Sequence, residues 1–486
     1  MMESTYLSFI LVPAAAAILI PFMAKLRPGF SDLVAGSVMV IGLASAISHI
    51  PFNDSLIYFA LNLSAGTPYD IFRGDTFSLL MIITIYTVGL SVVFFSSFYN
   101  EQNDRRGTYF ALLSLCVAAM SGVVAVRDFF TLYLFMEVAA VCSFALIAFE
   151  KSSEGIEGAV KYFFLSAPAS LFIMFSVAML LLYTSGTGFD TLSKAISAGT
   201  ASPAAITIIL GIMTCGFAVK AGLVPFHGWV PDAYQSAPAP ISALLSGIVT
   251  KVSGVYALVR ISMVLMKLYP GISTNTAGQA LMFLGAISIV IGAFGAMYQK
   301  DFKRMLAFSS ISQVGYIVLS AGVSTPLGIA GAIFHMFNHA TFKTTLFLNG
   351  ASIERATGTT GMNKLGGLES KMPWTSRTSV IAMLSTAGIP PLSGFWSKAI
   401  IVVALWKAGA YNYAALAVLA SVMTLAYFLI MQSKMFFGKT PEHLKNVKES
   451  GFAMLLPSLI LAALMIAIGL YFPLIFNKLI APAVML

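Results

Sequence analysis

The chain contains little charge and no long polar stretch. Of its 486 residues, 58% are hydrophobic and only 10% are charged, and the mean hydropathy is +0.89. This composition excludes an ordinary soluble domain and is typical of a protein embedded in the bilayer. Because no hydrophilic stretch is long enough for a separate domain, we expect one integral membrane unit. The net charge of +9 comes mostly from short loops, so it does not indicate nucleic-acid binding.

Cysteine is also scarce. Cys116, Cys142 and Cys215 are isolated in apolar segments and form no CxxC cluster, so neither an iron–sulfur centre nor zinc is indicated. A GxGxxG motif after a strand is absent as well. We therefore expect no cofactor and no bound metal, and we regard a redox enzyme with its own quinone or haem chemistry as a weak alternative.

Long apolar runs predict an all-α polytopic membrane protein. Each of fourteen runs is near or above the ~20 residues that a helix needs to cross a bilayer. Glu3 precedes the first run and a basic leader does not, so we expect a retained span. Residues 51–74 are predicted as an extramembrane hairpin and residues 185–202 as a short interfacial segment. The predicted spans are about 5–25, 32–50, 75–98, 107–126, 128–149, 157–184, 203–224, 238–267, 277–299, 304–323, 327–353, 378–406, 411–437 and 452–476.

Lysine and arginine are distributed unevenly between the two sides of this bundle. The loops that follow the odd-numbered spans hold sixteen of them, and the loops on the other side hold six. Because positively charged loops stay in the cytoplasm, the first side is predicted to be cytoplasmic. An even number of spans then places both termini on the extracytoplasmic side of the cell membrane.

Charged residues within the predicted spans are the unusual content of the chain. A charge at membrane depth is expensive and marks a functional site by default. Lys220 precedes Pro225, which we expect to interrupt its helix, and interrupted helices are the usual place of ion sites in transporters. Alternatively, Lys220 could extend from a helix end, and Lys251 could be satisfied by backbone carbonyls. The full set is Glu137, Lys161, Lys220, Lys251, Arg260, Lys343 and Lys398, of which Arg260 is more consistent with a structural role.

Glu137 is predicted to be the partner of Lys220. It lies about ten residues past Arg127, roughly 15 Å along a helix and so near mid-membrane. Burial favours the neutral form of a carboxyl group, whereas a lysine within ~4–6 Å favours its charged form. A movable pair would act as a switch, because separating the partners encourages the lysine to release a proton. The alternative is a static ion pair, which is a costly way to gain stability.

A second group of polar residues follows one helix face. His335, His339 and Lys343 are spaced by four residues, so two imidazoles and a lysine share that face. Imidazole titrates near physiological pH, and the face could therefore relay protons. Plain packing and a metal site remain alternatives, although neither an acidic ligand nor an HExxH motif is nearby.

A second broken span is predicted at Pro390 and Pro391, again followed by a lysine, Lys398. The two breaks fall five spans apart, which predicts two inverted five-helix repeats, spans 4–8 and 9–13, each with one broken helix. We accordingly divide the chain into an N-terminal three-helix segment (1–106), a first repeat (107–268), a second repeat (269–437) and a C-terminal helix (438–486).

In this order the motifs resemble a known family, the antiporter-like membrane subunits shared by respiratory complex I (NADH-quinone oxidoreductase), Mrp cation/proton antiporters and membrane-bound energy-converting hydrogenases. The resemblance spans roughly residues 110–400. It rests on Met136-Glu137, on Lys220…Pro225-Phe-His-Gly-Trp-Val-Pro-Asp232 with Ala-Pro-Ala-Pro240, on Lys251, on Asp301-Phe-Lys-Arg304 with Ser309…Gln313-Val-Gly315-Tyr, on His335…His339…Lys343 and on Gly388-Ile-Pro-Pro…Gly394-Phe-Trp-Ser-Lys398.

The resemblance implies a fourteen-helix core with two half-channels. In that scheme Glu137 and Lys220 switch the first half-channel, Lys251 and the histidines form a central hydrophilic axis, and Lys398 gates the second half-channel. Lysine at 398 resembles the Mrp D-type subunit and the smallest complex I subunit, whereas the histidines are similar to the larger complex I member and to hydrogenase-type subunits. A hydrogenase- or Mrp-like assembly is thus favoured, with sister antiporter-like subunits, small membrane subunits and a redox module as partners.

The resulting hypothesis is a non-redox, proton-translocating subunit of a multisubunit ion-pumping complex of the hydrogenase, Mrp or complex I type. Sodium exchange would occur elsewhere in the complex, because no cluster of buried carboxylates offers a Na⁺ cage in this chain. The alternative is a self-contained secondary transporter for a solute or a cation. For that function the line of charges would be a poor binding pocket.

Overall fold

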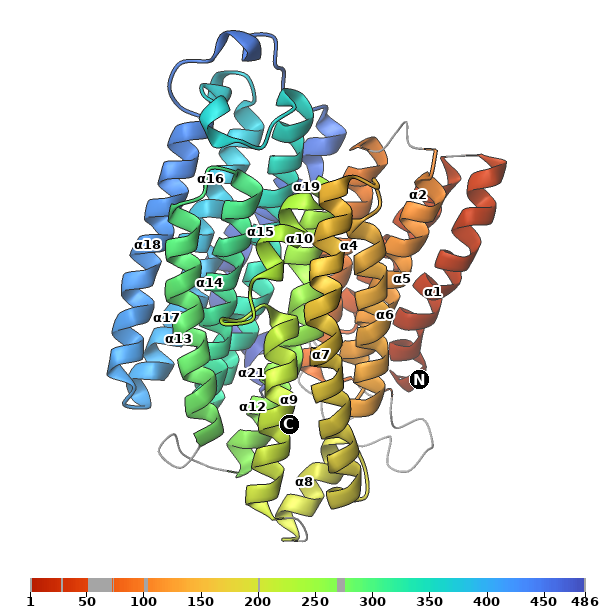
Figure 1. The fold of residues 1–486 in the computed structure, drawn as a ribbon, viewed down its shortest axis with the longest axis vertical. Coiled ribbons are helices and arrows are strands. Elements are labelled where there is room, and N and C mark those ends of the chain that lie inside the picture. The colour runs from red at the N-terminus through yellow and green to blue at the C-terminus, as the bar shows by residue number, and fades with distance from the viewer. Residues whose placement is uncertain are drawn as a thin grey trace.

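The computed structural model describes residues 2–27, 29–50, 72, 74–99, 104–199, 202–268 and 276–484. Across these ranges the chain forms helices and no β-strand, which confirms the predicted all-α fold (Figure 1). Most of the predicted 51–74 hairpin lies outside the described residues. A short helix, α8, occupies the middle of the predicted 185–202 segment.

The helices before residue 269 form the N-terminal segment and the first predicted repeat. They are α1 (Met2–Leu26), α2 (Phe30–Ser48), α4 (Thr76–Tyr99), α5 (Arg106–Ala125), α6 (Phe129–Ile147), α7 (Ser153–Thr184), α8 (Phe189–Ser197), α9 (Pro203–Ala221), α10 (Trp229–Ser236), α11 (Ala239–Leu244), the π-helical segments η1 (Leu245–Val249) and η2 (Lys251–Val255), and α12 (Tyr256–Leu268).

The remaining helices form the second predicted repeat and the C-terminal part. They are α13 (Thr276–Met297), α14 (Phe302–Gly322), α15 (Pro326–Thr357), the 3₁₀ turns η3 (Met362–Lys364) and η4 (Leu368–Ser370), α16 (Pro373–Ala387), α17 (Ser393–Lys407), α18 (Tyr411–Met435), the 3₁₀ turn η5 (Glu442–Leu444), α19 (Phe452–Leu470), α20 (Phe472–Ile475), the π-helical segment η6 (Phe476–Ile480) and α21 (Ala481–Ala483).

Twelve helical segments within the described ranges are long and apolar enough to cross a membrane. Two of the fourteen predicted spans are not among them. The first, 327–353, lies on α15, whose 32 residues are long enough but carry two histidines and a lysine. The second, 378–406, is divided into α16 and α17, each of 15 residues. The number fourteen therefore stays a prediction.

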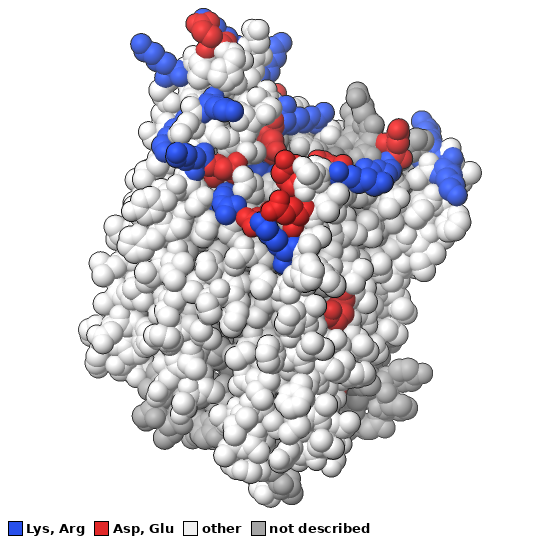
Figure 2. All heavy atoms as spheres, in the orientation of Figure 1, with Lys and Arg blue, Asp and Glu red and all other residues white. Residues whose placement is uncertain are grey.

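The bundle has two chemically different ends. In Figure 2 the charged side chains of the visible face gather at one end, opposite the end at which Figure 1 shows α8. We call these the charged end and the α8 end. Helices α5, α7, α14 and α16 begin toward the charged end, whereas α6 and α9 begin toward the α8 end. The flank between the ends is almost entirely uncharged, as a surface facing lipid would be.

The first helix break lies between α9 and α10. Gly222 ends α9 in the left-handed conformation, with a φ of +69°, and Pro225 follows before α10 begins. Glycine adopts this conformation without a steric penalty, and proline cannot continue a helix ladder. Gly254 of η2 packs against the same helix end, because a Cβ at this position would lie 2.3 Å from the Ala221 backbone nitrogen. The end of α9 is therefore in close backbone contact with η2, in the middle of the next span.

The second break, between α16 and α17, is built in the same way. Gly388 ends α16 with a φ of +86°, and Pro390 and Pro391 follow. Gly394, at the start of α17, lies so close to α16 that a Cβ would lie 1.9 Å from the Ser385 carbonyl oxygen. Only glycine fits at this contact, which holds the two half-helices against each other.

A short motif occurs twice, at the start of α6 and at the start of α14. In each copy an aspartate accepts from the backbone N–H three residues on, accepts from a threonine hydroxyl that follows the next long helix, and forms an isolated β-bridge with the glycine after that threonine. The residues are Asp128, Thr131, Thr187 and Gly188 in one copy, and Asp301, Arg304, Thr360 and Gly361 in the other.

Candidate functional site

Five lysines are buried in the described residues. Lys303, near the start of α14, contacts the Ala237 carbonyl and Glu354, and the other four lie on four different segments. Lys220 lies in the last turn of α9, Lys251 begins η2, Lys343 lies in α15 and Lys398 lies in α17. No more than 5% of any of them is exposed. A buried ammonium group is costly unless it is hydrogen-bonded or paired. The partners of each lysine therefore indicate what the site can do.

Lys220 is paired with Glu137 of α6. Its Nζ lies 2.9 Å from Glu137 Oε1 and donates to Ser166 Oγ at 2.6 Å. Ser170 Oγ, one turn further along α7, donates to the same glutamate oxygen at 2.6 Å. Two hydroxyl groups thus hold the pair, and neither serine was predicted. Their spacing of four residues on α7 was the only signal for them in the sequence.

Lys251 lies where the helix changes from one π-helical segment to the next. Its Nζ donates to the Ser246 carbonyl and, at 3.1 Å, to Thr250 Oγ1. A π-helical turn shifts the backbone ladder by one residue, and such turns are frequent at functional sites. Here the lysine bonds to the carbonyl of residue 246, a backbone partner of the kind that the sequence left as an alternative.

Lys343 contacts a pair of hydroxyl groups. Its Nζ donates to the Leu306 carbonyl at 3.0 Å and to Ser309 Oγ at 2.7 Å. Ser309 Oγ lies 2.8 Å from the hydroxyl of Tyr427, which is completely buried in α18. The chain Lys343–Ser309–Tyr427 links α15, α14 and α18. Tyr427 is about eighty residues away in sequence, and no sequence pattern assigned it to the site.

His335 is held between two side chains of different helices. Its Nδ1 lies 2.9 Å from Ser397 Oγ of α17, and its Nε2 lies 3.3 Å from Gln313 Oε1 of α14. Ser397 also donates to the Gly394 carbonyl at 3.1 Å, so its oxygen can accept from the ring. Both ring nitrogens therefore face possible acceptors, an arrangement that accommodates the doubly protonated imidazolium.

His339 and Lys398 differ from His335. Neither ring nitrogen of His339 makes a hydrogen bond to a side chain in the described part of the structure. Lys398 Nζ likewise has no hydrogen-bond partner within those ranges, and it lies 4.5 Å from the centre of the Tyr316 ring. Ser397, the neighbour of Lys398, touches His335. His335, but not His339, is therefore linked through Ser397 to the helix segment that carries Lys398.

At the charged end, Asp232 of α10 joins the first break to its surroundings. Its Oδ2 lies 2.8 Å from Lys161 Nζ of α7, and its Oδ1 lies 2.6 Å from Arg304 NH1 of α14. Burial alone would raise the pKa of the Asp232 carboxyl, but the hydrogen bonds from Lys161 and Arg304 outweigh burial and lower it. The charged form is therefore favoured, and we assign Asp232 a structural role.

The predicted site residues do not suit a metal ion. Within the described ranges, no group of three or more histidine, cysteine, aspartate or glutamate side chains is arranged to hold one. The polar groups are spread over the five segments α6, α9, η2, α15 and α17 instead of forming a shell around one point. This geometry is suited to passing a proton between successive groups.

Comparison with known proteins identifies the fold. Residues 126–424 match the family model described as "NADH:quinone oxidoreductase/Mrp antiporter, TM". The chain is 34% identical over 399 residues to the D-type subunit of the Na⁺/H⁺ antiporter of Alkalihalophilus pseudofirmus, an alignment that covers 81% of this chain and 79% of the relative. It is 32% identical over 405 residues to the N-type subunit of the NADH-quinone oxidoreductase of Desulforudis audaxviator, covering 80% of each chain.

The three-dimensional structure is similar to a subunit of a solved complex. A chain of the Mrp complex from Dietzia sp. superposes with a TM-score of 0.87 at 25% identity. The similarity covers 100% of this chain and 97% of that one.

Proposed function

Because this chain belongs to the NADH:quinone oxidoreductase/Mrp antiporter family of transmembrane proteins, we propose that it carries protons across the cell membrane along its buried lysines. It is an antiporter-like subunit of the kind found in multisubunit complexes of the Mrp and complex I types. The observation that carries the proposal is the burial of Lys220, Lys251, Lys343 and Lys398 on four different segments, with Lys220 paired with Glu137. Such an arrangement is expensive and contributes little to stability.

The Glu137–Lys220 pair is the first step of the proposed path. Burial disfavours a charged lysine, and a neighbouring carboxylate compensates for it. Movement of the carboxylate away from Lys220 would therefore promote release of its proton to the next group. Ser166 and Ser170 contact the lysine and the glutamate respectively, so they can hold each partner when the two separate.

The second part of the path runs from Lys251 to Lys398. Hydroxyl groups both donate and accept hydrogen bonds, so the Ser309–Tyr427 pair can pass a proton away from Lys343. His335 can hold a proton because both of its ring nitrogens face acceptors. Ser397 then connects His335 to the backbone next to Lys398.

The distribution of charge supports a sidedness for the protein. Sixteen loop lysines and arginines fall on the predicted cytoplasmic side and six on the other, and Figure 2 shows the visible charge at one end. We propose that the charged end faces the cytoplasm and the α8 end faces outward, with both termini extracytoplasmic. Protons would then be taken up near the first helix break.

Two inverted repeats, with the predicted boundaries, are part of the same proposal. Both breaks combine a left-handed glycine, proline and a lysine at the neighbouring helix end, and the aspartate–threonine–glycine motif occurs once in each repeat. Inverted repeats with one broken helix each are typical of transporters in which the ion site lies at their interface.

The exposure of Glu137 supports a neighbouring subunit. One third of this side chain is exposed although it lies in the middle of α6, and apolar side chains such as Leu134, Val138 and Val141 are exposed beside it. A carboxylate at this depth is expensive to leave against lipid. We propose that a sister antiporter-like subunit covers it, and that any Na⁺ exchange or redox module belongs to other subunits.

The proposal is tested by proton uptake into vesicles that contain the assembled complex. We expect Lys220→Ala and Glu137→Ala to abolish uptake while the complex still assembles. Lys445→Ala is the control, because this lysine is 59% exposed and pairs with Glu442 of the same loop. Normal proton uptake by assembled Lys220→Ala complexes would refute the proposal.

A further inference from the structure

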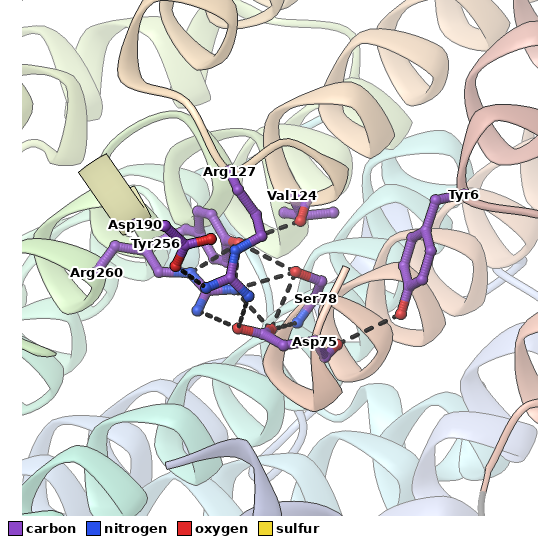
Figure 3. Close-up of polar contacts among 8 residues, drawn as sticks. All are labelled: Tyr6, Asp75, Ser78, Val124, Arg127, Asp190, Tyr256 and Arg260. Carbon is purple, nitrogen blue, oxygen red and sulfur yellow. Dashed lines mark hydrogen bonds and ion pairs between the residues drawn. The ribbon is translucent and has the colours of Figure 1, made fainter. Parts of the chain in front are cut away.

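A cluster of ionic groups lies at the α8 end of the helix that carries Lys251. Arg260 stands nine residues beyond Lys251, about 13 Å further along the span. Figure 3 shows its guanidinium surrounded by Asp75, Ser78, Tyr256 and Arg127. This cluster lies outside the proposed proton path, and its chemistry differs from that of the lysines.

The inner layer of the cluster is an ion pair between α12 and the start of α4. Arg260 NH1 lies 2.5 Å from Asp75 Oδ2, and its NH2 lies 2.7 Å from Asp75 Oδ1 (Figure 3). The guanidinium also donates to the Tyr256 hydroxyl at 2.7 and 2.9 Å and to Ser78 Oγ at 3.0 Å. The Tyr256 hydroxyl in turn donates to the Val124 carbonyl at 3.1 Å. Each of the three guanidinium nitrogens and both carboxylate oxygens therefore has at least one partner.

The outer layer joins this pair to the surface. Arg127 NH1 lies 4.0 Å from Asp75 Oδ2, and its NH2 lies 3.0 Å from Asp190 Oδ1 of α8. Side-chain exposure falls from 61% at Asp190 through 19% at Arg127 and 14% at Asp75 to 3% at Arg260. The cluster therefore extends from the surface inward toward Lys251 without a break.

Neither charged group of the inner layer, Arg260 or Asp75, can take part in a proton relay. An arginine side chain is not deprotonated in proteins. Burial alone would raise the pKa of the Asp75 carboxyl, but the Arg260 charge and hydrogen bonds lower it to about 2. A relay needs groups that gain and lose protons near neutral pH, and a fixed positive charge in a narrow passage repels cations.

We propose that Arg260, Asp75 and Arg127 form a fixed-charge barrier that closes the α8 end of the first repeat to protons and alkali cations. This inference rests on the proposed function, in which Lys251 holds a translocated proton. The barrier prevents that proton from leaving Lys251 directly toward the α8 end. It directs the proton through Lys343 and His335 to Lys398 in the second repeat.

The barrier is tested by passive proton permeability of vesicles that contain the complex without its energy source. After a pH jump, with potassium and valinomycin clamping the potential, we expect Arg260→Gln to leak about tenfold faster than wild type. That factor corresponds to one unit charge removed at ~13 Å in a medium of effective dielectric constant ~20. The added replacement Lys251→Ala should abolish the extra leak, because the proton would pass that lysine.

Arg106→Gln is the matched control. Arg106 of α5 forms a similar ion pair with Asp32 of α2, and the side chains are 12% and 14% exposed, but the pair lies far along the chain from Lys251. A leak as large in Arg106→Gln as in Arg260→Gln, or no extra leak in Arg260→Gln, overturns the barrier and leaves a purely structural latch.

A second variant keeps the test decisive if Arg260→Gln does not assemble. Arg260→Lys retains a positive partner for Asp75 but introduces a group that can titrate. The barrier predicts a measurable leak for this variant, and a structural latch predicts none. The outcomes also separate the two proposals. Translocation that depends on Lys220 with no leak in either Arg260 variant refutes the barrier alone, whereas translocation independent of Lys220 refutes the proposed function.

Discussion

Lys220 and Glu137 form an ion pair of 2.9 Å in which the lysine is completely buried and one third of the glutamate is exposed. The exposed partner can respond to a neighbouring subunit, and the buried partner can respond only to the glutamate and to internal hydroxyls. In the proposed function, this pair transmits an event at the subunit surface to the interior of the bundle.

The first prediction concerns the chemistry of this pair. Glu137→Gln preserves the shape of the side chain but removes its charge, so Lys220 loses the carboxylate that stabilises its ammonium form. We expect proton translocation to fall by about 100-fold, within the range that single proton-transfer groups contribute. Glu137→Asp should restore part of it. Equal rates for the Gln and Asp variants would show that charge at this position is irrelevant.

The second prediction concerns Tyr427. Tyr427→Phe removes the hydroxyl that accepts from or donates to Ser309, and we expect translocation to slow by about 100-fold. Tyr86→Phe is the control, because the Tyr86 hydroxyl donates to the Phe9 carbonyl of α1, outside the proposed path. Adding Ser309→Ala to Tyr427→Phe should cause little further loss, since two groups acting in series are not additive. Wild-type rates for Tyr427→Phe exclude this branch of the path.

The third prediction separates the two histidines. His335 contacts Gln313 and Ser397, whereas His339 makes no hydrogen bond to a side chain in the described ranges. We expect His335→Gln to lose translocation and His339→Gln to retain most of it, measured on complexes with the same subunit composition. The reverse result would show that the path follows the His339 side of α15.

The fourth prediction concerns stability at low pH. The pKa of the Asp75 carboxyl is lowered from 3.8 to about 2 by Arg260 despite its burial, so its stabilising effect is complete above pH ~5 and is lost as the pH falls toward about 2. The Tm of detergent-solubilised protein should therefore exceed that of Asp75→Asn by a constant amount from about pH 7 to 5. The difference should then shrink with further acidification. A difference that persists unchanged at the lowest pH contradicts the assignment.

Much of the fold and part of the site could be predicted from the sequence. Apolar runs indicated the membrane helices, and proline next to glycine indicated both breaks, because these residues act locally on the backbone. The lysines Lys220, Lys251, Lys343 and Lys398 were conspicuous because charge is rare in apolar runs. Their burial follows directly from their position in the middle of the bundle.

The partners of these residues could not be predicted in the same way. Ser166 and Tyr427 are ordinary residues for a membrane helix, and only the packing of α7 and α18 brings them to Lys220 and Ser309. The π-helical turns around Lys251 have no reliable sequence pattern. The sequence favoured a structural role for Arg260, and that role stays a prediction. Its partner Asp75 lies 185 positions away, and no local rule connects the two.

The most direct test of the claim that protons pass along the buried lysines uses Lys398, the last lysine of the proposed path. In assembled Lys398→Ala complexes the Glu137–Lys220 pair is untouched, and proton translocation into vesicles can be measured against wild type and against Lys445→Ala. If protons travel past all four buried lysines, Lys398→Ala loses translocation and Lys445→Ala retains it. Translocation at the wild-type rate by Lys398→Ala would show that protons do not cross the membrane along these lysines.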